Sequence, residues 1–198
     1  MTGTRTKLLR NPEFVHLGAE LEKHLEDWIG SSGPENLAGL LDDTCVTLLR
    51  DAFVAVGGCE GTVWLTDRDR QHLVAVYNSG SDAVSLVGFE QPIGSGIISL
   101  VFSQQQPYCE NDILASRGHD DTLDKKVAKR TKAMIAVPFY FGFGLRGVVS
   151  CVQLEENSAG GSGYSFEDVR TLVNVTNIVE RLIDDSLLSS ALGLSDGG

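Results

Sequence analysis

The sequence predicts a single α+β domain built on an antiparallel sheet. Its 198 residues fit one domain with a helical extension, and the apolar fraction of 42% is spread along the chain between regular turn signals. The predicted elements run helix, helix, strands, short helix, strands, helix, which is not the regular strand–helix alternation of a parallel α/β fold. This order favours antiparallel strands with helices packed against them.

Two helices are predicted before the sheet. Apolar residues recur every three or four positions from Phe14 to Trp28, which is the spacing of one helical stripe. Ser32 and Glu35 have the spacing of a capping box, so a second helix is expected from Pro34 to about Val56.

The first strands should follow at once. The β-rich segments Thr62–Thr66 and His72–Tyr77 are joined by a polar tract, which predicts a hairpin. A third strand is expected at Val84–Phe89. The glycine-containing segment Pro92–Gly96 then leads into a short apolar helix that ends before Pro107.

The second half of the sheet is expected to contain its most buried strands. Tyr108–Glu110 is a short strand candidate, followed by a polar loop from Asn111 to about Asp120 and a basic helix up to Arg130. Ala133–Phe141 and Leu145–Leu154 are nearly continuous apolar segments, so we expect a central hairpin buried on both faces.

A long helix should close the domain. Ser165 and Asp168 mark its capped start, and its apolar residues cover more than one face, so burying them takes the sheet and a second helical surface. We therefore expect a helical extension over residues 1–33, the domain over 34–185 and a flexible tail over 186–198.

Charge, hydropathy and cysteine content argue against several kinds of protein. The 27 acidic and 16 basic residues give a formal charge of -11, which repels phosphate backbones, so no nucleic-acid partner is expected. No segment approaches the ~20 apolar residues of a membrane helix, so we expect a cytoplasmic protein without membrane contact. The four cysteines form no C-x-x-C pair, which favours free thiols.

Five short strings occur in a fixed order and suggest a family. They are Gly61-Thr62-Val63-Trp64-Leu65-Thr66-Asp67, Pro92-Ile93-Gly94-Ser95-Gly96-Ile97-Ile98, Met134-Ile135-Ala136-Val137-Pro138, Arg146-Gly147-Val148-Val149 and Phe166-Glu167-Asp168. Together they resemble the GAF domain, a small-molecule-binding and dimerisation module of signalling proteins. The resemblance spans roughly residues 34–185.

This resemblance implies a six-stranded antiparallel sheet with the long N- and C-terminal helices on one face and a ligand pocket on the other. The roof of the pocket would be Gly94–Phe102 and Tyr108–Arg130. Apolar walls with a few placed polar groups suit a ligand, although Trp64 and Tyr77 fit ordinary core packing equally well. The expected ligand-binding residues are Thr62, Trp64, Tyr77, Asn78, Gly96, Ile97, Ile98, Val101, Tyr108, Cys109, Met134 and Ser150.

Specialised GAF relatives differ from this sequence. Free methionine sulfoxide reductases carry cysteines in the pocket helix and in the loop before the fifth strand, whereas only Cys109 lies between those segments here. We therefore expect no enzymatic activity, with a reductase as the minor alternative. Cyclic-nucleotide GAF domains carry an Asn-Lys pair where this chain has Gln153-Leu154, but Phe166 and Asp168 resemble the remainder of that signature. A cyclic nucleotide therefore stays one ligand candidate among other metabolites.

The expected function is that of a stand-alone sensory regulator. Ligand occupancy would change the roof and, through the sheet, the long helices. The signal would then be passed on by the association of these helices with a partner. We expect a homodimer through the N- and C-terminal helices, or a signalling protein as partner. The alternative is an interaction scaffold whose pocket is filled by its own side chains. The triplet His119-Asp120-Asp121 is expected to be solvated rather than to bind a metal.

Overall fold

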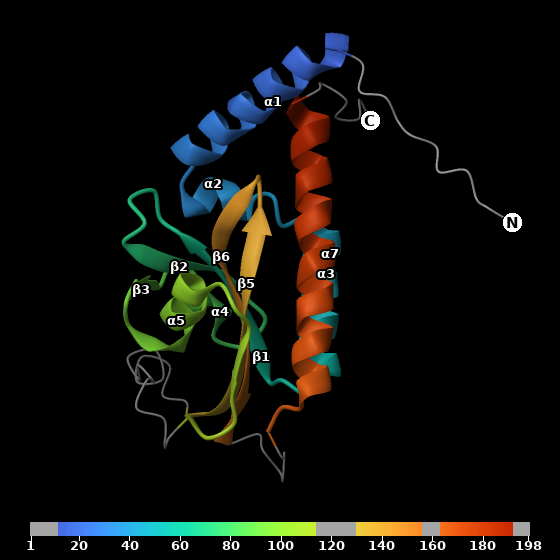
Figure 1. The fold of residues 1–198 in the computed structure, drawn as a ribbon. Helices are drawn as coiled ribbons and strands as arrows, with labels where there is room; N and C mark the ends of the chain where they lie inside the picture. Colours follow the sequence, from blue (N-terminus) through green and yellow to red (C-terminus); the bar gives the residue numbers. More distant parts are fainter. Residues whose placement is uncertain (1–11, 114–129, 156–162, 192–198) are drawn as a thin grey trace, which may run out of the picture.

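A six-stranded antiparallel sheet organises the chain, as the sequence predicts. The computed structural model describes residues 12–113, 130–155 and 163–191 (Figure 1). The strand order is β3-β2-β1-β6-β5-β4, and every neighbouring pair is antiparallel. The strands are β1 (Glu60–Thr66), β2 (His72–Asn78), β3 (Glu90–Pro92), β4 (Tyr108–Glu110), β5 (Thr131–Phe141) and β6 (Gly144–Leu154).

Helices cover both faces of this sheet, and the two faces differ in what covers them. The helices are α1 (Pro12–Ser31), α2 (Pro34–Ala38), α3 (Asp43–Ala55), α4 (Ala83–Leu86), α5 (Gly96–Gln104) and α7 (Phe166–Ala191). The long helices α3 and α7 lie side by side against one face, which we call the helix face (Figure 1). The short helix α5 covers β5 and β6 on the other, which we call the α5 face.

Strand alternation divides the apolar residues between two cores. Val63 and Leu65 of β1 belong to the helix-face core, together with Phe53 of α3 and Leu172 of α7. Trp64, which lies between Val63 and Leu65, belongs to the α5-face core. Because successive strand residues point to opposite faces, the same strands supply both cores.

The predicted third strand is wrong. The chain forms the short helix α4 at Ala83–Leu86, and the strand that pairs with β2 is Glu90–Pro92. Val84 is 95% exposed and Leu86 is buried, so the β-branched composition of this segment does not correspond to a buried strand face. Local helical hydrogen bonds, such as Leu86 N to Asp82 O at 3.0 Å, prevail over composition here.

The predicted second helix is divided in two. The helical segments α2 and α3 are separated at residues 39–42, and the Asp42 side chain caps α3 by accepting a 2.8 Å hydrogen bond from Cys45 N. The expected capping box at Ser32 does not form. The Ser32 hydroxyl donates to Trp28 O at the end of α1, and the N-cap of α2 is Gly33.

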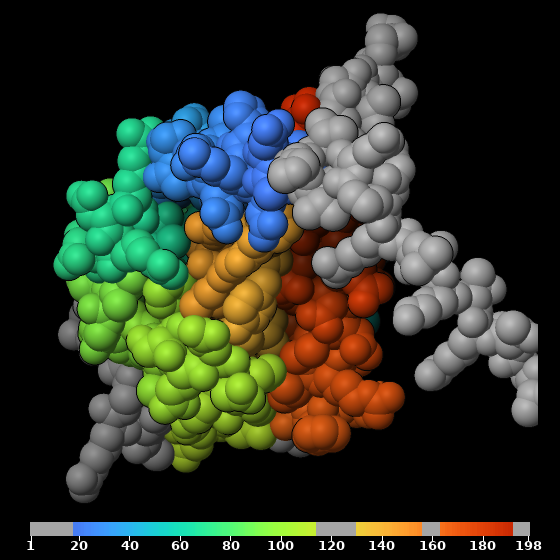
Figure 2. All heavy atoms as spheres, turned by 45° about the horizontal axis from the view of Figure 1, so that its top comes forward, coloured from blue at the N-terminus to red at the C-terminus, as the bar shows by residue number. Residues whose placement is uncertain are grey.

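The helical extension packs on the domain. Leu25 and Ile29 of α1 are buried in the helix-face core, and Figure 2 shows α1 lying across the end of the β5–β6 hairpin. Residues 186–191, which we expected to belong to a flexible tail, continue α7, and Leu187 is buried. Residues 192–198 lie outside the described residues.

One free edge of the sheet is covered by carboxylates of α7. β4 pairs with β5 only from Met134 to Ala136. Further along this edge Pro138 has no N–H, Tyr140 N donates to Glu180 Oε1, and Gly142 N donates to Asp184 Oδ1, both at 2.7 Å. Since Glu180 and Asp184 are one helical turn apart, α7 lies along the edge and satisfies both exposed backbone donors.

Among the described residues, no helix is long and apolar enough to cross a membrane.

Candidate ligand face of the sheet

A row of polar residues crosses the α5 face. In the strand registers Asn78 pairs with Thr62, Thr62 with Ser150, Ser150 with Ala136, and Ala136 with Tyr108. The row therefore runs across β2, β1, β6, β5 and β4. Asn78, Thr62 and Ser150 are each at most 7% exposed, so three polar side chains of neighbouring strands are buried in an otherwise apolar face.

Two hydrogen bonds hold this polar row. Asn78 Nδ2 donates to Thr62 Oγ1 at 2.9 Å, and Trp64 Nε1 donates to Ser150 Oγ at 3.0 Å. The Asn78 amide is fixed in turn, because its Oδ1 accepts from Gly80 N at 2.8 Å. Within the described part of the chain, neither the Thr62 nor the Ser150 hydroxyl donates to an acceptor, so each buried oxygen keeps one donor position open.

Apolar side chains surround the row. The buried residues Ile97, Ile98 and Val101 of α5 pack with Trp64 and Met134. The Trp64 ring meets Phe89 edge-on, with 6.4 Å between ring centroids and an interplanar angle of 80°. This T-shaped contact holds the indole in place, so its N–H stays directed at Ser150.

The start of α5 is fixed against β3. Gly96 begins the helix with φ +75, a left-handed conformation that glycine adopts without a Cβ clash. Ser99 Oγ donates to Pro92 O at 3.0 Å, and Gln91 Nε2 donates to Ser95 O at 3.2 Å. These bonds attach the described part of the roof to the edge of the sheet.

Most of the predicted ligand-binding residues share the α5 face. Tyr108 packs against its apolar core, and Gly96 lies at the start of the covering helix. The others on this face are Thr62, Trp64, Asn78, Ile97, Ile98, Val101, Met134 and Ser150. Residues 114–129, where we expected the remaining roof, the basic helix and the His119-Asp120-Asp121 triplet, lie outside the described residues.

Two of the predicted residues lie on the helix face rather than on the α5 face. Tyr77 pairs with Val63 and packs against the helix-face core, as does Cys109, which pairs with Ile135. Adjacent strand residues point to opposite faces, so Tyr77 cannot share a face with Asn78, nor Cys109 with Tyr108. The same alternation would have identified Ala136 and Val148, buried α5-face residues that sequence reasoning missed.

The cysteines of the described chain are free thiols. Burial raises the pKa of Cys45 to about 11 and that of Cys151 to about 12. Cys151 Sγ also accepts a hydrogen bond from the buried Tyr164 hydroxyl at 3.6 Å. Cys45 and Cys151 belong to the helix-face core, and Cys109 packs against it.

Several solved structures with a similar fold are GAF domains. No protein-family model and no curated protein matches the chain. The GAF domain of a phosphoenolpyruvate-protein phosphotransferase from Coxiella burnetii is 16% identical with a TM-score of 0.58, covering 89% of this chain and 96% of that domain. The GAF-B domain of DevS from Mycobacterium smegmatis is 16% identical with a TM-score of 0.55, covering 76% and 98%. The chain therefore has a GAF-like fold.

The comparisons correct one expectation. Free methionine-R-sulfoxide reductase from Neisseria meningitidis, solved with its substrate, is 17% identical with a TM-score of 0.56, covering 93% of this chain and 97% of the enzyme. The reductase of Staphylococcus aureus has a TM-score of 0.52. Because enzymes share this fold, the expectation that the chain has no enzymatic activity does not follow from it and is withdrawn.

Proposed function

We propose that this GAF-fold chain is a sensory domain that binds a small molecule on the α5 face, over the polar row of Asn78, Thr62 and Ser150. One observation carries the proposal. The hydroxyls of Thr62 and Ser150 are buried, directly paired across β1 and β6, and without an acceptor among the described residues.

The energetics of buried hydroxyls support a ligand. Each of these hydroxyls accepts one hydrogen bond but donates none among the described residues, and a buried donor left without an acceptor costs about 1–3 kcal/mol. A ligand with an acceptor group over Thr62 and Ser150 would satisfy both donors at once. The surrounding apolar side chains of Trp64, Ile97 and Met134 would bury the rest of the molecule, which is the usual division of roles in ligand pockets.

A signal from this site would leave through the helix face. The ligand face and the helix face are two sides of the same strands, so a shift of β1 or β6 on one side moves the packing of α3 and α7 on the other. We propose a homodimer through α1 and α7, or a protein partner on them. Trp28 of α1 and Ile178 of α7 support this, since they are 40% and 48% exposed. The free thiols fit a cytoplasmic location.

The experiment is a thermal-shift screen followed by native mass spectrometry on the whole chain. The probes are cyclic GMP, cyclic AMP, methionine sulfoxide and a metabolite library. We expect a compound that raises the melting temperature of the wild type, with the shift lost in Thr62→Val. Thr176→Val is the matched control, because it removes a buried hydroxyl from the helix face. Equal shifts in both variants would contradict the assignment of the site.

A scaffold function is the second candidate, and one observation favours it. The α5 face is filled in its described part by large side chains, with Trp64 1% exposed and Met134 7% exposed. If the domain is a scaffold, no probe binds and the helices alone carry its interactions. Size-exclusion chromatography with light scattering tests the dimer in both cases, and a monomer at high micromolar concentration would exclude it.

A further inference from the structure

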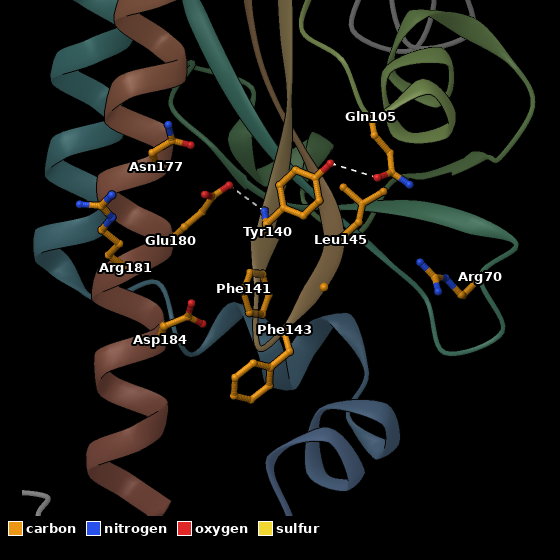
Figure 3. A pocket seen from close by; sticks show the side chains of 11 residues that line it. Arg70, Gln105, Tyr140, Phe141, Phe143, Leu145, Asn177, Glu180, Arg181 and Asp184 are labelled. Carbon is orange, nitrogen blue, oxygen red and sulfur yellow. Dashed lines mark hydrogen bonds between the residues drawn. The ribbon is translucent and has the colours of Figure 1, made fainter. Parts of the chain in front are cut away.

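Three turns of the chain meet around one hollow, and each presents a residue in a strained conformation. Among the described residues, the non-glycine residues with positive φ are Arg70 (φ 54), Gln105 (φ 57) and Phe143 (φ 65). All three line the same open hollow of about 760 Å³ between α7, the β5–β6 hairpin and the β1–β2 turn (Figure 3). Strained residues that gather at one place indicate a functional site, because glycine would fit each turn more easily.

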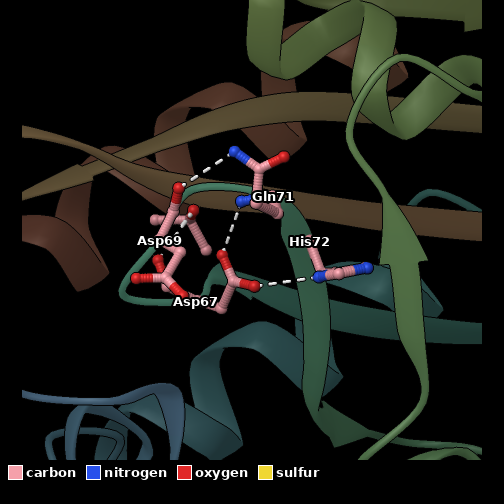
Figure 4. A network of polar contacts seen from close by, with 5 residues as sticks. Asp67, Asp69, Gln71 and His72 are labelled. Atoms are coloured by element: carbon pink, nitrogen blue, oxygen red, sulfur yellow. Dashed lines mark hydrogen bonds and ion pairs between the residues drawn. The ribbon is translucent and has the colours of Figure 1, made fainter.

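Hydrogen bonds hold Arg70 in its turn. The Asp67 carboxylate accepts from Gln71 N at 2.7 Å and lies 2.9 Å from His72 Nδ1 (Figure 4). Arg70 N donates to Asp67 O at 3.2 Å. The Gln71 amide also donates to Asp69 O at 3.2 Å. This network closes the β1–β2 turn. The exposed Arg70 lines the hollow, and its guanidinium lies 5.8 Å from the centre of the Phe102 ring of α5.

The other two turns are fixed as well. Gln105 N donates to Val101 O at 2.8 Å, and Gln105 Oε1 accepts from the Tyr140 hydroxyl at 3.2 Å. Phe143 sits at the tip of the β5–β6 hairpin with its side chain 59% exposed. Arg146 clamps the hairpin by donating to Gly142 O at 2.8 Å. A rigid turn that holds an aromatic ring in solvent is suited to contact another molecule.

The charges of the hollow favour an acidic occupant. Arg70 and Arg181 are exposed, and within the described chain no carboxylate forms an ion pair with either guanidinium. Glu180 and Asp184 are directed at the backbone of β5, where each accepts a hydrogen bond at 2.7 Å. Burial also raises the pKa of Glu180 to about 7, which reduces its negative charge at neutral pH. Among the described residues that line the hollow, the cations are Arg70 and Arg181, and neither forms an ion pair within 4 Å.

We propose that this hollow, which we call the three-turn groove, binds an extended acidic peptide segment of a partner protein. An apolar side chain of the peptide rests on Phe143, Tyr140 and Leu145 in the middle of the groove. Carboxylates on either side of it meet Arg70 at one end and Arg181 at the other. The amides of Gln105 and Asn177 lie beside these contacts and can pair with the peptide backbone.

Charge also favours this place over most of the surface. The formal charge of -11 repels acidic segments in general, and the two arginines of the groove offset that repulsion locally. The three-turn groove is separate from the polar row, and the proposal does not depend on a small-molecule ligand.

The test uses an array of labelled heptapeptides with a central Phe, Tyr, Trp, Leu or Ile and every combination of Asp and Glu at the flanking positions. A second array carries Lys and Arg at the flanks. We expect acidic peptides to bind the whole chain and basic ones to fail, with affinity falling as salt rises from 50 to about 300 mM. No binding in the acidic array, or equal binding in both, would overturn the proposal.

Variants identify the site. Phe143→Gly and Arg70→Gly relieve the left-handed strain, so each should fold with an unchanged or higher melting temperature while peptide affinity falls at least tenfold. Arg68→Gly is the matched control, since Arg68 carries the same charge in the same turn but pairs with Glu35 at 3.8 Å, away from the groove. Wild-type affinity in Phe143→Gly, or an equal loss in Arg68→Gly, would show that the peptide binds elsewhere.

Discussion

The two faces of the sheet are built from the same strands but differ in polarity. The helix face is closed by α3 and α7 over a large apolar core that includes Leu49, Phe53 and Leu172. The α5 face has a smaller core crossed by the polar row of Asn78, Thr62 and Ser150. The difference teaches that strand alternation lets one sheet carry a largely apolar core on one side and buried polar groups on the other.

Buried hydroxyls sharpen this comparison. On the α5 face the hydroxyl oxygens of Thr62 and Ser150 each accept a hydrogen bond from a neighbouring strand residue. On the helix face Thr176 of α7 is 1% exposed, and its Oγ1 has no hydrogen-bond partner among the described residues. The first two hydroxyls belong to an organised polar site, whereas the third is an isolated polar atom in a core.

The largest effect is expected in the helix-face core. Phe53→Ala should lower the free energy of unfolding by about 3–5 kcal/mol, because the ring is 1% exposed and fills the space beside Gly61. Urea unfolding measures it. The neighbouring Val54→Ala is the control, since Val54 is 71% exposed and its loss should stay within about 0.5 kcal/mol. A small effect for Phe53→Ala would mean that this face does not carry the stability.

A smaller loss is expected on the α5 face. Ser150→Ala should lower the free energy of unfolding by about 1–3 kcal/mol, because the buried Trp64 Nε1–H loses its acceptor. In a Trp64→Phe background the same substitution should cost much less, which a double-mutant cycle measures. Equal costs in the two backgrounds would show that the hydrogen bond is not the cause.

The opposite sign is expected for the helix-face hydroxyl. Thr176→Val should raise the free energy of unfolding by about 1 kcal/mol, because it removes an unpaired polar atom and keeps the shape of the side chain. Thermal and urea unfolding measure the change. A loss of stability would indicate that the hydroxyl has a partner in solution.

The smallest effect concerns pH at the edge of the sheet. Burial raises the pKa of Glu180 from 4.5 to about 7, so between these values the folded state binds more protons than the unfolded state. Stability from this group therefore falls as pH rises through that window. Because Glu180 is only half-buried, solvent screening reduces its contribution. The free energy of unfolding should therefore fall by about 1 kcal/mol less in Glu180→Gln than in the wild type as pH rises through this window. Unfolding at pH 5 and 7.5 tests it, and parallel pH profiles would contradict it.

Local sequence signals predict the structure correctly where a single segment decides the outcome. Ser165 and Asp168 form the predicted capping box, with Ser165 N donating to Asp168 Oδ2 at 2.7 Å and Asp168 N donating to Ser165 Oγ at 3.2 Å. The long apolar segments of β5 and β6 form the predicted hairpin. The same spacing at Ser32 and Glu35 failed, because the Ser32 hydroxyl is already bonded to the preceding helix.

Features that depend on pairing between distant segments were not predictable from the sequence. The polar row follows from the register of five strands, and a bulge at Val63/Trp64 interrupts the pairing of β1 with β2. Strand alternation, by contrast, separates Tyr108 from Cys109 on the sequence alone, because adjacent strand residues point to opposite faces. The three-turn groove combines residues from three separate turns, and no sequence pattern indicates that Arg70, Gln105 and Phe143 adopt a left-handed backbone.

The covered edge of β5 has a consequence for fragments of this protein. If α7 were cut away or unwound, Tyr140 N and Gly142 N would lose their carboxylate acceptors and become open to a strand from another molecule. Such an edge can template intermolecular sheet growth. Truncated forms that end before Phe166 should therefore precipitate or form fibres. In the whole chain, α7 would prevent this self-association by covering the edge of β5.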